Sequence, residues 1–174
     1  MYVFDVRLAD ADRSVNESLT IRVAQHPSET AEYLLTRVLA YCLEYTDGIA
    51  FSKGLSDPDE PAIVVRDLTG VLQAWIEVGS PDAERLHRAA KAAPDVAVYS
   101  HRGLGALVAR LDGKRIHRAG EIRLRAVEPP LLAALVARLD RRMSLDLTVS
   151  DHTLYVYLGD ETLTGVLEER RLDA

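Results

Sequence analysis

Residues 63–99, IVVRDLTGVLQAWIEVGSPDAERLHRAAKAAPDVAVY, decide the fold. Two apolar runs, Ile63–Arg66 and Val71–Val78, are typical of β-strands. The four residues between them, Asp67–Gly70, have the composition of a tight turn. This part of the sequence therefore predicts an antiparallel hairpin.

A helix and a third strand follow the hairpin. Ser80 supplies an N-cap, Pro81 suits the first helical position, Asp82 is an acid in the first turn, and Pro94 ends the helix. Val96–Tyr99 then reads as a short buried strand. Strand, helix and strand in this order almost always form a right-handed crossover between parallel strands. The second hairpin strand and the third strand should therefore lie in one sheet.

Further elements on both sides complete a mixed α/β fold. Alternating apolar residues predict a hairpin at each end of the chain, and apolar residues at helical spacing predict two more helices. These elements are strands Tyr2–Ala9 and Ser18–Ala24, a helix capped by Ser28 and ended by Gly48, a helix over Pro129–Arg141, and strands Leu145–Val149 and Leu154–Leu158. No repeat or long linker divides the chain, so residues 1–174 are expected to form a single domain.

The sequence has the features of a cytoplasmic protein. It contains no run of 18 apolar residues, and charged side chains interrupt the first ten residues, so we expect neither a membrane span nor a signal peptide. The mature protein is therefore expected to begin at Met1. The only cysteine, Cys42, falls in an apolar helical pattern and is interpreted as a core residue.

Charge is distributed unevenly along the chain, whose net charge is -6. Residues 85–125 carry ten Lys or Arg against three acids, which gives +7, whereas residues 1–84 and 126–174 carry -9 and -4. Lys and Arg bind nucleic acids by displacing counterions from phosphates. The basic segment 85–125 is thus a candidate surface for DNA or RNA, the alternative being a solvated surface that binds nothing.

Two carboxylates are expected to face each other in the central hairpin. A four-residue turn would place Arg66 opposite Val71 and hence Glu60 opposite Glu77. Like charges at such close range are destabilising unless a cation neutralises them. Mg²⁺ prefers oxygen ligands of this kind, so the pair is a candidate metal site at the carboxyl end of a strand, where α/β proteins often bind ligands. A one-residue bulge would substitute Asp59 for Glu60, and solvated strand ends are the alternative.

Several spaced motifs resemble the YaeQ family. They are His26-Pro27-Ser28-Glu29-Thr30, Ser52-Lys53-Gly54-Leu55, Asp59-Glu60-Pro61, Trp75-Ile76-Glu77-Val78-Gly79, and Pro81-Asp82 followed by Arg85. The resemblance implies a mixed sheet with a variant PD-(D/E)XK nuclease-like core, to which N-terminal and C-terminal hairpins are added. It also implies that Glu29, Glu77 and either Asp59 or Glu60 form the acidic site, binding Mg²⁺ or Mn²⁺.

One element of that nuclease pattern is missing. A lysine usually lies two residues after the second acid, but Gly79 stands there. Arg85 and Arg88, one helical turn apart, could contact phosphate in its place, and Lys53 is a third candidate. An arginine is a poor base, so a bound metal would have to lower the pKa of the attacking water.

The sequence thus leads to three hypotheses. The first is a metal-dependent nuclease or phosphodiesterase in which Glu60 or Asp59 and Glu77 bind the metal, Glu29 completes the acidic shell and Arg85 contacts phosphate. The second, motivated by the missing lysine, is a catalytically silent module on the same scaffold that binds nucleic acid or an acidic protein. The third is a protein-interaction module whose motif residues only hold the fold.

Overall fold

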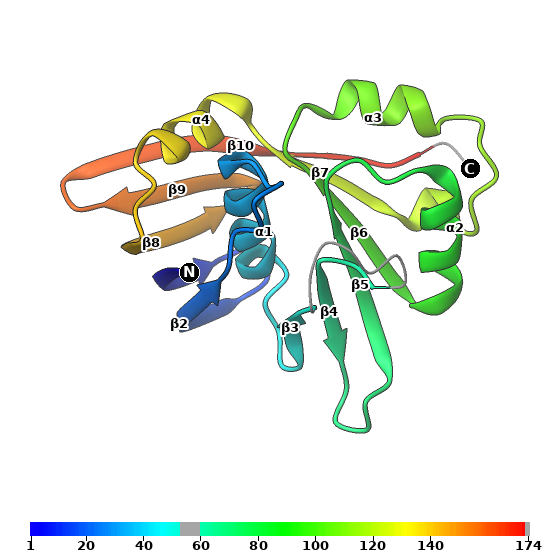
Figure 1. The fold of residues 1–174 in the computed structure, drawn as a ribbon, viewed down its shortest axis with the longest axis horizontal. Helices are drawn as coiled ribbons and strands as arrows, with labels where there is room; N and C mark the ends of the chain where they lie inside the picture. The colour runs from blue at the N-terminus through cyan, green and yellow to red at the C-terminus, as the bar shows by residue number, and fades with distance from the viewer. Residues whose placement is uncertain (53–59, 173–174) are drawn as a thin grey trace.

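The computed structural model describes residues 1–52 and 60–172, which form a mixed α/β fold (Figure 1). The strands are β1 (Tyr2–Asp10), β2 (Val15–Val23), β3 (Ile49–Phe51), β4 (Ile63–Arg66), β5 (Leu72–Val78), β6 (Asp95–Ser100), β7 (Arg123–Val127), β8 (Arg142–Ser150), β9 (Thr153–Leu158) and β10 (Glu161–Arg170). The helices are α1 (Ala31–Leu43), α2 (Ala83–Ala92), α3 (Leu104–Leu111) and α4 (Pro129–Ala137), with a short 3-10 turn at Ala119–Glu121. In these ranges no helix is long and apolar enough to cross a membrane.

The ten strands found in the described residues form one mixed sheet in the order β2-β1-β8-β9-β10-β7-β6-β5-β4-β3. The long strand β10 joins its two halves (Figure 1). Glu161–Val166 of β10 pair with β9, whereas Leu167–Arg170 pair with β7, antiparallel in both cases. The first half thus contains β2, β1, β8 and β9, and the second contains β7, β6, β5, β4 and β3.

Two hydrophobic cores cover the two faces of the second half. The larger core packs α1 and α4 against the inner face of the first half and against one face of β4–β6, with Phe4 and Leu34 fully buried. The smaller core packs α2 and α3 against the other face of β5–β7, through residues such as Leu86 and Val98. Cys42 is buried in the larger core, as predicted.

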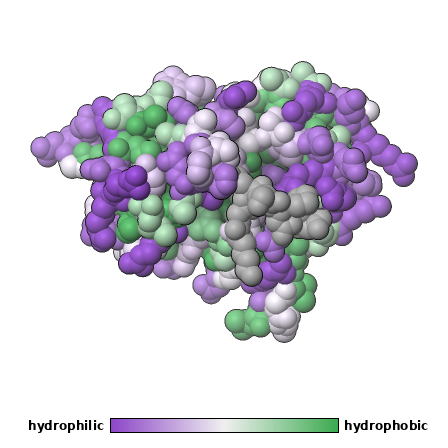
Figure 2. All heavy atoms as spheres, in the orientation of Figure 1, coloured by the Kyte–Doolittle hydropathy of each residue, from purple (hydrophilic) through white to green (hydrophobic). Residues whose placement is uncertain are grey.

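The predicted strand–helix–strand unit is confirmed. Strands β5 and β6 are parallel neighbours, with Glu77 paired with Val98 and Val78 with Tyr99, and α2 connects them. The predicted hairpins β1–β2, β4–β5 and β8–β9 are also present. Hydrophilic residues cover much of the surface, but the tip of the β4–β5 hairpin is hydrophobic (Figure 2), since Leu68 and Val71 are exposed there.

The predicted start of helix α1 was wrong by two residues. Thr30, and not Ser28, caps α1, because its hydroxyl accepts a hydrogen bond from the Tyr33 amide at 3.1 Å. A tight turn in which the Glu29 amide donates to the His26 carbonyl holds Ser28 outside the helix. Helix α1 also ends at Leu43, before Gly48.

Helix α2 shows the same kind of shift. Asp82 caps it by accepting a hydrogen bond from the Arg85 amide at 2.8 Å, so Ser80 and Pro81 precede the helix. An acid at the N-cap satisfies a free amide as well as a serine does. Helix α4 begins at Pro129 as predicted but ends at Ala137.

The predicted register of the β4–β5 hairpin was wrong. Arg66 pairs with Leu72 instead of Val71, and an irregularity beside Arg66 shifts the pairing further, so that Ile63 lies opposite Ile76. The continuation of this register places Ala62, and not Glu60, across from Glu77. The turn is longer than four residues because the Asp67 amide donates to the Val71 carbonyl, while the Asp67 carboxylate accepts the Val71 amide.

Candidate functional site

Glu77 lies at the end of β5, on the face that α2 covers. Its side chain is only 8% exposed. Oε1 accepts a hydrogen bond from the Trp75 indole at 2.7 Å and another from Arg85 Nε at 2.8 Å. Burial raises the pKa of Glu77, and the positive charge of Arg85 with these two hydrogen bonds offsets only part of the rise. The site therefore holds a carboxylate that takes up a proton more readily than an exposed one.

Arg85 connects Glu77 to the segment before β4. The Asp82 cap fixes the first turn of α2, so the Arg85 side chain reaches back over the end of β5. Arg85 Nη2 donates a hydrogen bond to the Glu60 carbonyl at 2.7 Å, while Nε donates to Glu77. The guanidinium lies 5.6 Å from the centre of the Trp75 ring. One cation thus contacts a carboxylate oxygen and a carbonyl oxygen at the same time.

Glu29 is placed apart from this pair, just before α1. Its Oε1 accepts a hydrogen bond from the His26 amide at 3.1 Å, and Oε2 lies 3.4 Å from the Arg37 guanidinium. The side chain is 2% exposed and lines a pocket of about 450 Å³ that Arg22 also borders. Glu29 is therefore a buried carboxylate that Arg37 neutralises.

Tyr33, on the first turn of α1, is influenced by the charges of both Glu29 and Glu77. Burial raises the pKa of its phenol; Arg37 and Arg85 oppose this rise, whereas the charges of Glu29 and Glu77 add to it. Tyr33 is thus within electrostatic range of both carboxylates. Within the described ranges, however, no three His, Cys, Asp or Glu side chains are grouped so that they could hold a metal ion.

The backbone at Gly79 explains why the expected lysine is absent. Gly79 has a φ of +111°, which disfavours a residue with a side chain. A Cβ there would lie 3.5 Å from Cε2 of Tyr33, while the Gly79 amide donates to the Tyr99 carbonyl. A lysine at this position would need a strained backbone.

The structure describes only some of the remaining predicted residues. Lys53 and Asp59 lie outside the described residues. Glu60 contributes its carbonyl oxygen, and Arg88 is exposed on α2, three residues after Arg85. Among the described residues, the structure therefore brings Glu77, Arg85 and the Glu60 backbone together.

A basic pocket that the sequence did not predict lies at the carboxyl ends of β5 and β6. It has a volume of about 380 Å³, and Ser80, His101, Arg102 and Arg110 are among its lining residues, none of which is acidic. Arg110 donates to the Ser80 carbonyl at 2.7 Å. Helix α3 starts here at Gly103 without a side-chain cap, so its first amides are available for an anion. His101 lies between this pocket and Tyr33, since the two rings make an edge contact with their centres 5.9 Å apart.

Tyr99 belongs to a different cluster, on the opposite face of the sheet. Its hydroxyl donates to the buried Glu44 carboxylate, which also binds Arg123 at 2.6 Å and Arg125 at 3.2 Å. Burial alone would raise the pKa of Glu44, but the hydrogen bonds and charges of these two arginines with the Tyr99 hydroxyl lower it below the usual value. Tyr99 therefore packs in a salt-bridge network and does not contact Glu77.

Part of the basic segment 85–125 binds other groups of the protein. The arginines that bind protein carboxylates or carbonyls include Arg85, Arg110, Arg118, Arg123 and Arg125. Exposed residues of the segment include Arg88, Lys91, Arg102, Arg110, Lys114, Arg115 and Arg118. Carboxylates neutralise Arg85, Arg123 and Arg125, and Arg102 places part of the remaining positive charge beside the basic pocket.

Sequence and structure comparisons agree with each other. The family model described as YaeQ protein matches residues 1–166. Proteins named "Uncharacterized protein YaeQ" are 30% identical over 158 residues in Escherichia coli K12 and 29% identical over 157 residues in Salmonella typhi. Each alignment covers 90% of this chain and 87% of the relative.

Two solved structures have the same overall fold. The crystal structure of YaeQ protein from Pseudomonas syringae superposes with a TM-score of 0.85 at 30% identity, covering 99% of this chain and 95% of the other. That of YaeQ protein from Xanthomonas axonopodis pv. citri gives 0.83 at 26% identity, covering 99% and 98%. The likeness therefore extends over both halves of the sheet.

Proposed function

Since the chain belongs to the YaeQ family, and its motifs resemble the PD-(D/E)XK pattern, we propose that it is a metal-dependent phosphodiesterase of the nuclease type. One observation carries the proposal. Glu77 is a buried carboxylate at the carboxyl end of a strand, and a single cation, Arg85, touches both its oxygen and the Glu60 carbonyl. We infer that the two oxygens that accept hydrogen bonds from this guanidinium would bind a divalent cation in its place after Arg85 moves aside.

The donor set suits Mg²⁺ or Mn²⁺. Both cations prefer carboxylate and carbonyl oxygens with water completing the shell. Glu77 and the Glu60 backbone would supply two such oxygens, and the side chain of Glu60 or of Asp59 a third. The metal would lower the pKa of a bound water. Glu29, which Arg37 neutralises, would support this acidic shell from the first turn of α1.

The basic pocket supplies the binding of phosphate. The free amides of α3 and the charges of Arg102 and Arg110 favour an anion at the sheet edge where β5 and β6 end. Arg85, released from Glu77, would contact phosphate on the other side, with Arg88 and Lys53 as further candidates. DNA or RNA is the proposed substrate class, because neighbouring phosphates could reach both places.

A second function is favoured by the same ion pair. Arg85 already neutralises Glu77, and the indole of Trp75 supplies a further donor, so the site is balanced without a metal. A catalytically silent module that binds nucleic acid or an acidic protein through exposed residues of the segment 85–125 fits that observation.

Cleavage assays distinguish the two functions. Single-stranded DNA, duplex DNA and RNA are incubated with the protein and Mg²⁺ or Mn²⁺, with EDTA as a blank. The nuclease proposal expects cleavage by the wild type, loss of at least about tenfold in Glu77→Gln, and full activity in Glu161→Gln, which alters an exposed ion pair far from the site.

Gel shifts without metal complete the comparison. Salt-sensitive binding with no cleavage of any substrate supports the silent module. Cleavage that survives Glu77→Gln removes Glu77 from the metal site and contradicts the proposed mechanism.

A further inference from the structure

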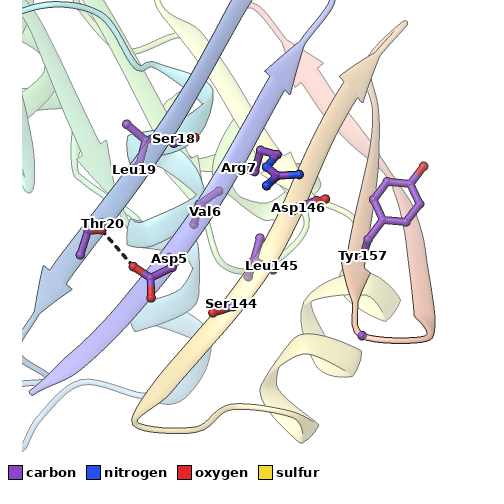
Figure 3. Close-up of a pocket in the computed structure, with 11 residues that line it drawn as sticks. Asp5, Val6, Arg7, Ser18, Leu19, Thr20, Ser144, Leu145, Asp146 and Tyr157 are labelled. Atoms are coloured by element: carbon purple, nitrogen blue, oxygen red, sulfur yellow. Dashed lines mark hydrogen bonds between the residues drawn. The ribbon is translucent and has the colours of Figure 1, made fainter.

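A polar hollow lies on the first half of the sheet, on the face opposite the larger core. Its volume is about 420 Å³, within the range of small-molecule sites. Alternating exposure on β8 shows how it arises: Met143 and Leu145 point into the core, whereas Ser144 and Asp146 point outward. The outward residues of four neighbouring strands form the surface shown in Figure 3.

The strand registers align these residues in rows. Arg7 pairs with Ser18 on one side and with Asp146 on the other, and Asp146 pairs with Tyr157. A serine hydroxyl, a guanidinium, a carboxylate and a phenol ring thus follow one another across the sheet (Figure 3). Neighbouring strands are about 4.8 Å apart, so the row spans roughly 14 Å.

A second row, formed by Thr20, Asp5 and Ser144, is held by hydrogen bonds and an ion pair. Asp5 accepts a hydrogen bond from the Thr20 hydroxyl at 2.9 Å (Figure 3) and binds Arg142 at 2.8 Å. These bonds fix the Asp5 carboxylate beside Ser144, with which it shares a register position. The hollow therefore has one fixed side.

The row from Ser18 to Tyr157, by contrast, contains side-chain donors and acceptors that make no hydrogen bond to described protein groups. Across the described part of the chain, the side chains of Arg7, Asp146, Ser18 and Tyr157 make no hydrogen bond or ion pair with protein groups, although Arg7 and Asp146 are cross-strand neighbours of opposite charge. Cross-strand charge pairs normally stabilise a sheet. A donor and an acceptor side by side, both unused, suit a ligand that offers an acceptor and a donor at the same spacing.

We propose that this hollow binds a neutral sugar or a similar polyhydroxylated ring. Adjacent hydroxyls would donate to Asp146 and accept from Arg7, and the ring of Tyr157, which is 40% exposed, would pack against the apolar face of the sugar. Asp5 and Asp146 disfavour a phosphate or nucleic acid, while Arg7 disfavours a free cation. The site is remote from Glu77 and does not depend on the proposed nuclease activity.

Titrations followed by NMR test the proposal. Maltotriose, cellotriose and chitotriose are added to the ¹⁵N-labelled protein, and inorganic phosphate serves as the comparison. At least one trisaccharide is expected to bind with a Kd on the order of 1 mM or tighter and to shift the amides of residues 5–7, 18–20 and 144–146. Phosphate should leave these amides unchanged.

Variants identify the contacts. Arg7→Ala and Asp146→Ala should each weaken binding at least about tenfold. Arg22→Ala removes an exposed arginine of the same sheet that does not line the hollow, so it should bind like the wild type. All three residues are exposed, and the amide spectra report whether each variant folds. The proposal is overturned if no trisaccharide shifts these amides, or if the shifts persist in both Arg7→Ala and Asp146→Ala.

Discussion

Replacement of Glu44 by glutamine should destabilise the fold more than any surface charge change. Glu44 is 7% exposed and binds Arg123 and Arg125, so Glu44→Gln leaves two buried guanidinium groups facing an amide. Removal of one partner from a buried ion pair costs about 3–5 kcal/mol. Asp95 and Glu169 still bind the two arginines, so we expect about 2–3 kcal/mol here, or roughly 4–12 °C in Tm.

Urea unfolding followed by circular dichroism measures this loss. Glu161→Gln is the matched control, because Glu161 pairs with Arg138 at 2.8 Å but is 55% exposed, and such pairs contribute less than about 1 kcal/mol. The pKa of Glu44 is lowered in the folded state, so its contribution is present above the ordinary pKa of a glutamate and is lost as the pH falls through the folded value. The difference in free energy of unfolding between wild type and Glu44→Gln should therefore become smaller below about pH 4. Equal losses in Glu44→Gln and Glu161→Gln would refute the reasoning.

Three further predictions concern single positions. Gly79→Lys restores the lysine of the nuclease pattern but should lower stability by about 1–3 kcal/mol in thermal melts, because a side chain at a φ of +111° strains the backbone; an unchanged Tm would contradict this. Because burial raises the pKa of Glu77, protons should displace Mg²⁺ from it at a higher pH than from an exposed glutamate, so calorimetric affinity that stays constant down to pH 4.5 would exclude Glu77 as a ligand. Burial also raises the pKa of Cys42 to about 12, so a thiol reagent at pH 8 should label it only when urea unfolds the protein, and rapid labelling of the native state would argue against a core position.

Elements with a local signal could be predicted from the sequence. The β1–β2 and β8–β9 hairpins show alternation around polar turns, and the β4–β5 hairpin shows two apolar runs around a turn. Helix α2 between two apolar runs correctly indicated the parallel pair β5–β6. Strand β10 was not predicted, since its pairing with both halves joins residues far apart in sequence. Helix α3 and strand β7 were not predicted, because the many charged residues of the basic segment obscure the periodicity of the apolar ones.

Only the part of the candidate site that depends on contacts between residues close in sequence could be predicted. Arg85 is three residues after a helix cap and eight after Glu77, so its return to the sheet edge could be predicted, and the structure contains that contact. The hairpin register could not, because it depends on how the Asp67 side chain widens the turn. The side-chain contacts of Arg110 and Glu44 could not be predicted, since their partners lie 29 or more residues away in the sequence.

Calorimetric titration of Mg²⁺ and Mn²⁺ into the wild type, Glu77→Gln and Arg85→Met tests the metal site most directly. Glutamine keeps the shape of Glu77 and removes its charge, whereas methionine at position 85 removes the cation that shares the Glu77 and Glu60 oxygens. The proposed site predicts micromolar to low millimolar binding by the wild type, on the order of tenfold tighter binding by Arg85→Met and loss of binding by Glu77→Gln. No binding by the wild type, or equal binding by wild type and Glu77→Gln, would contradict a metal centre at Glu77.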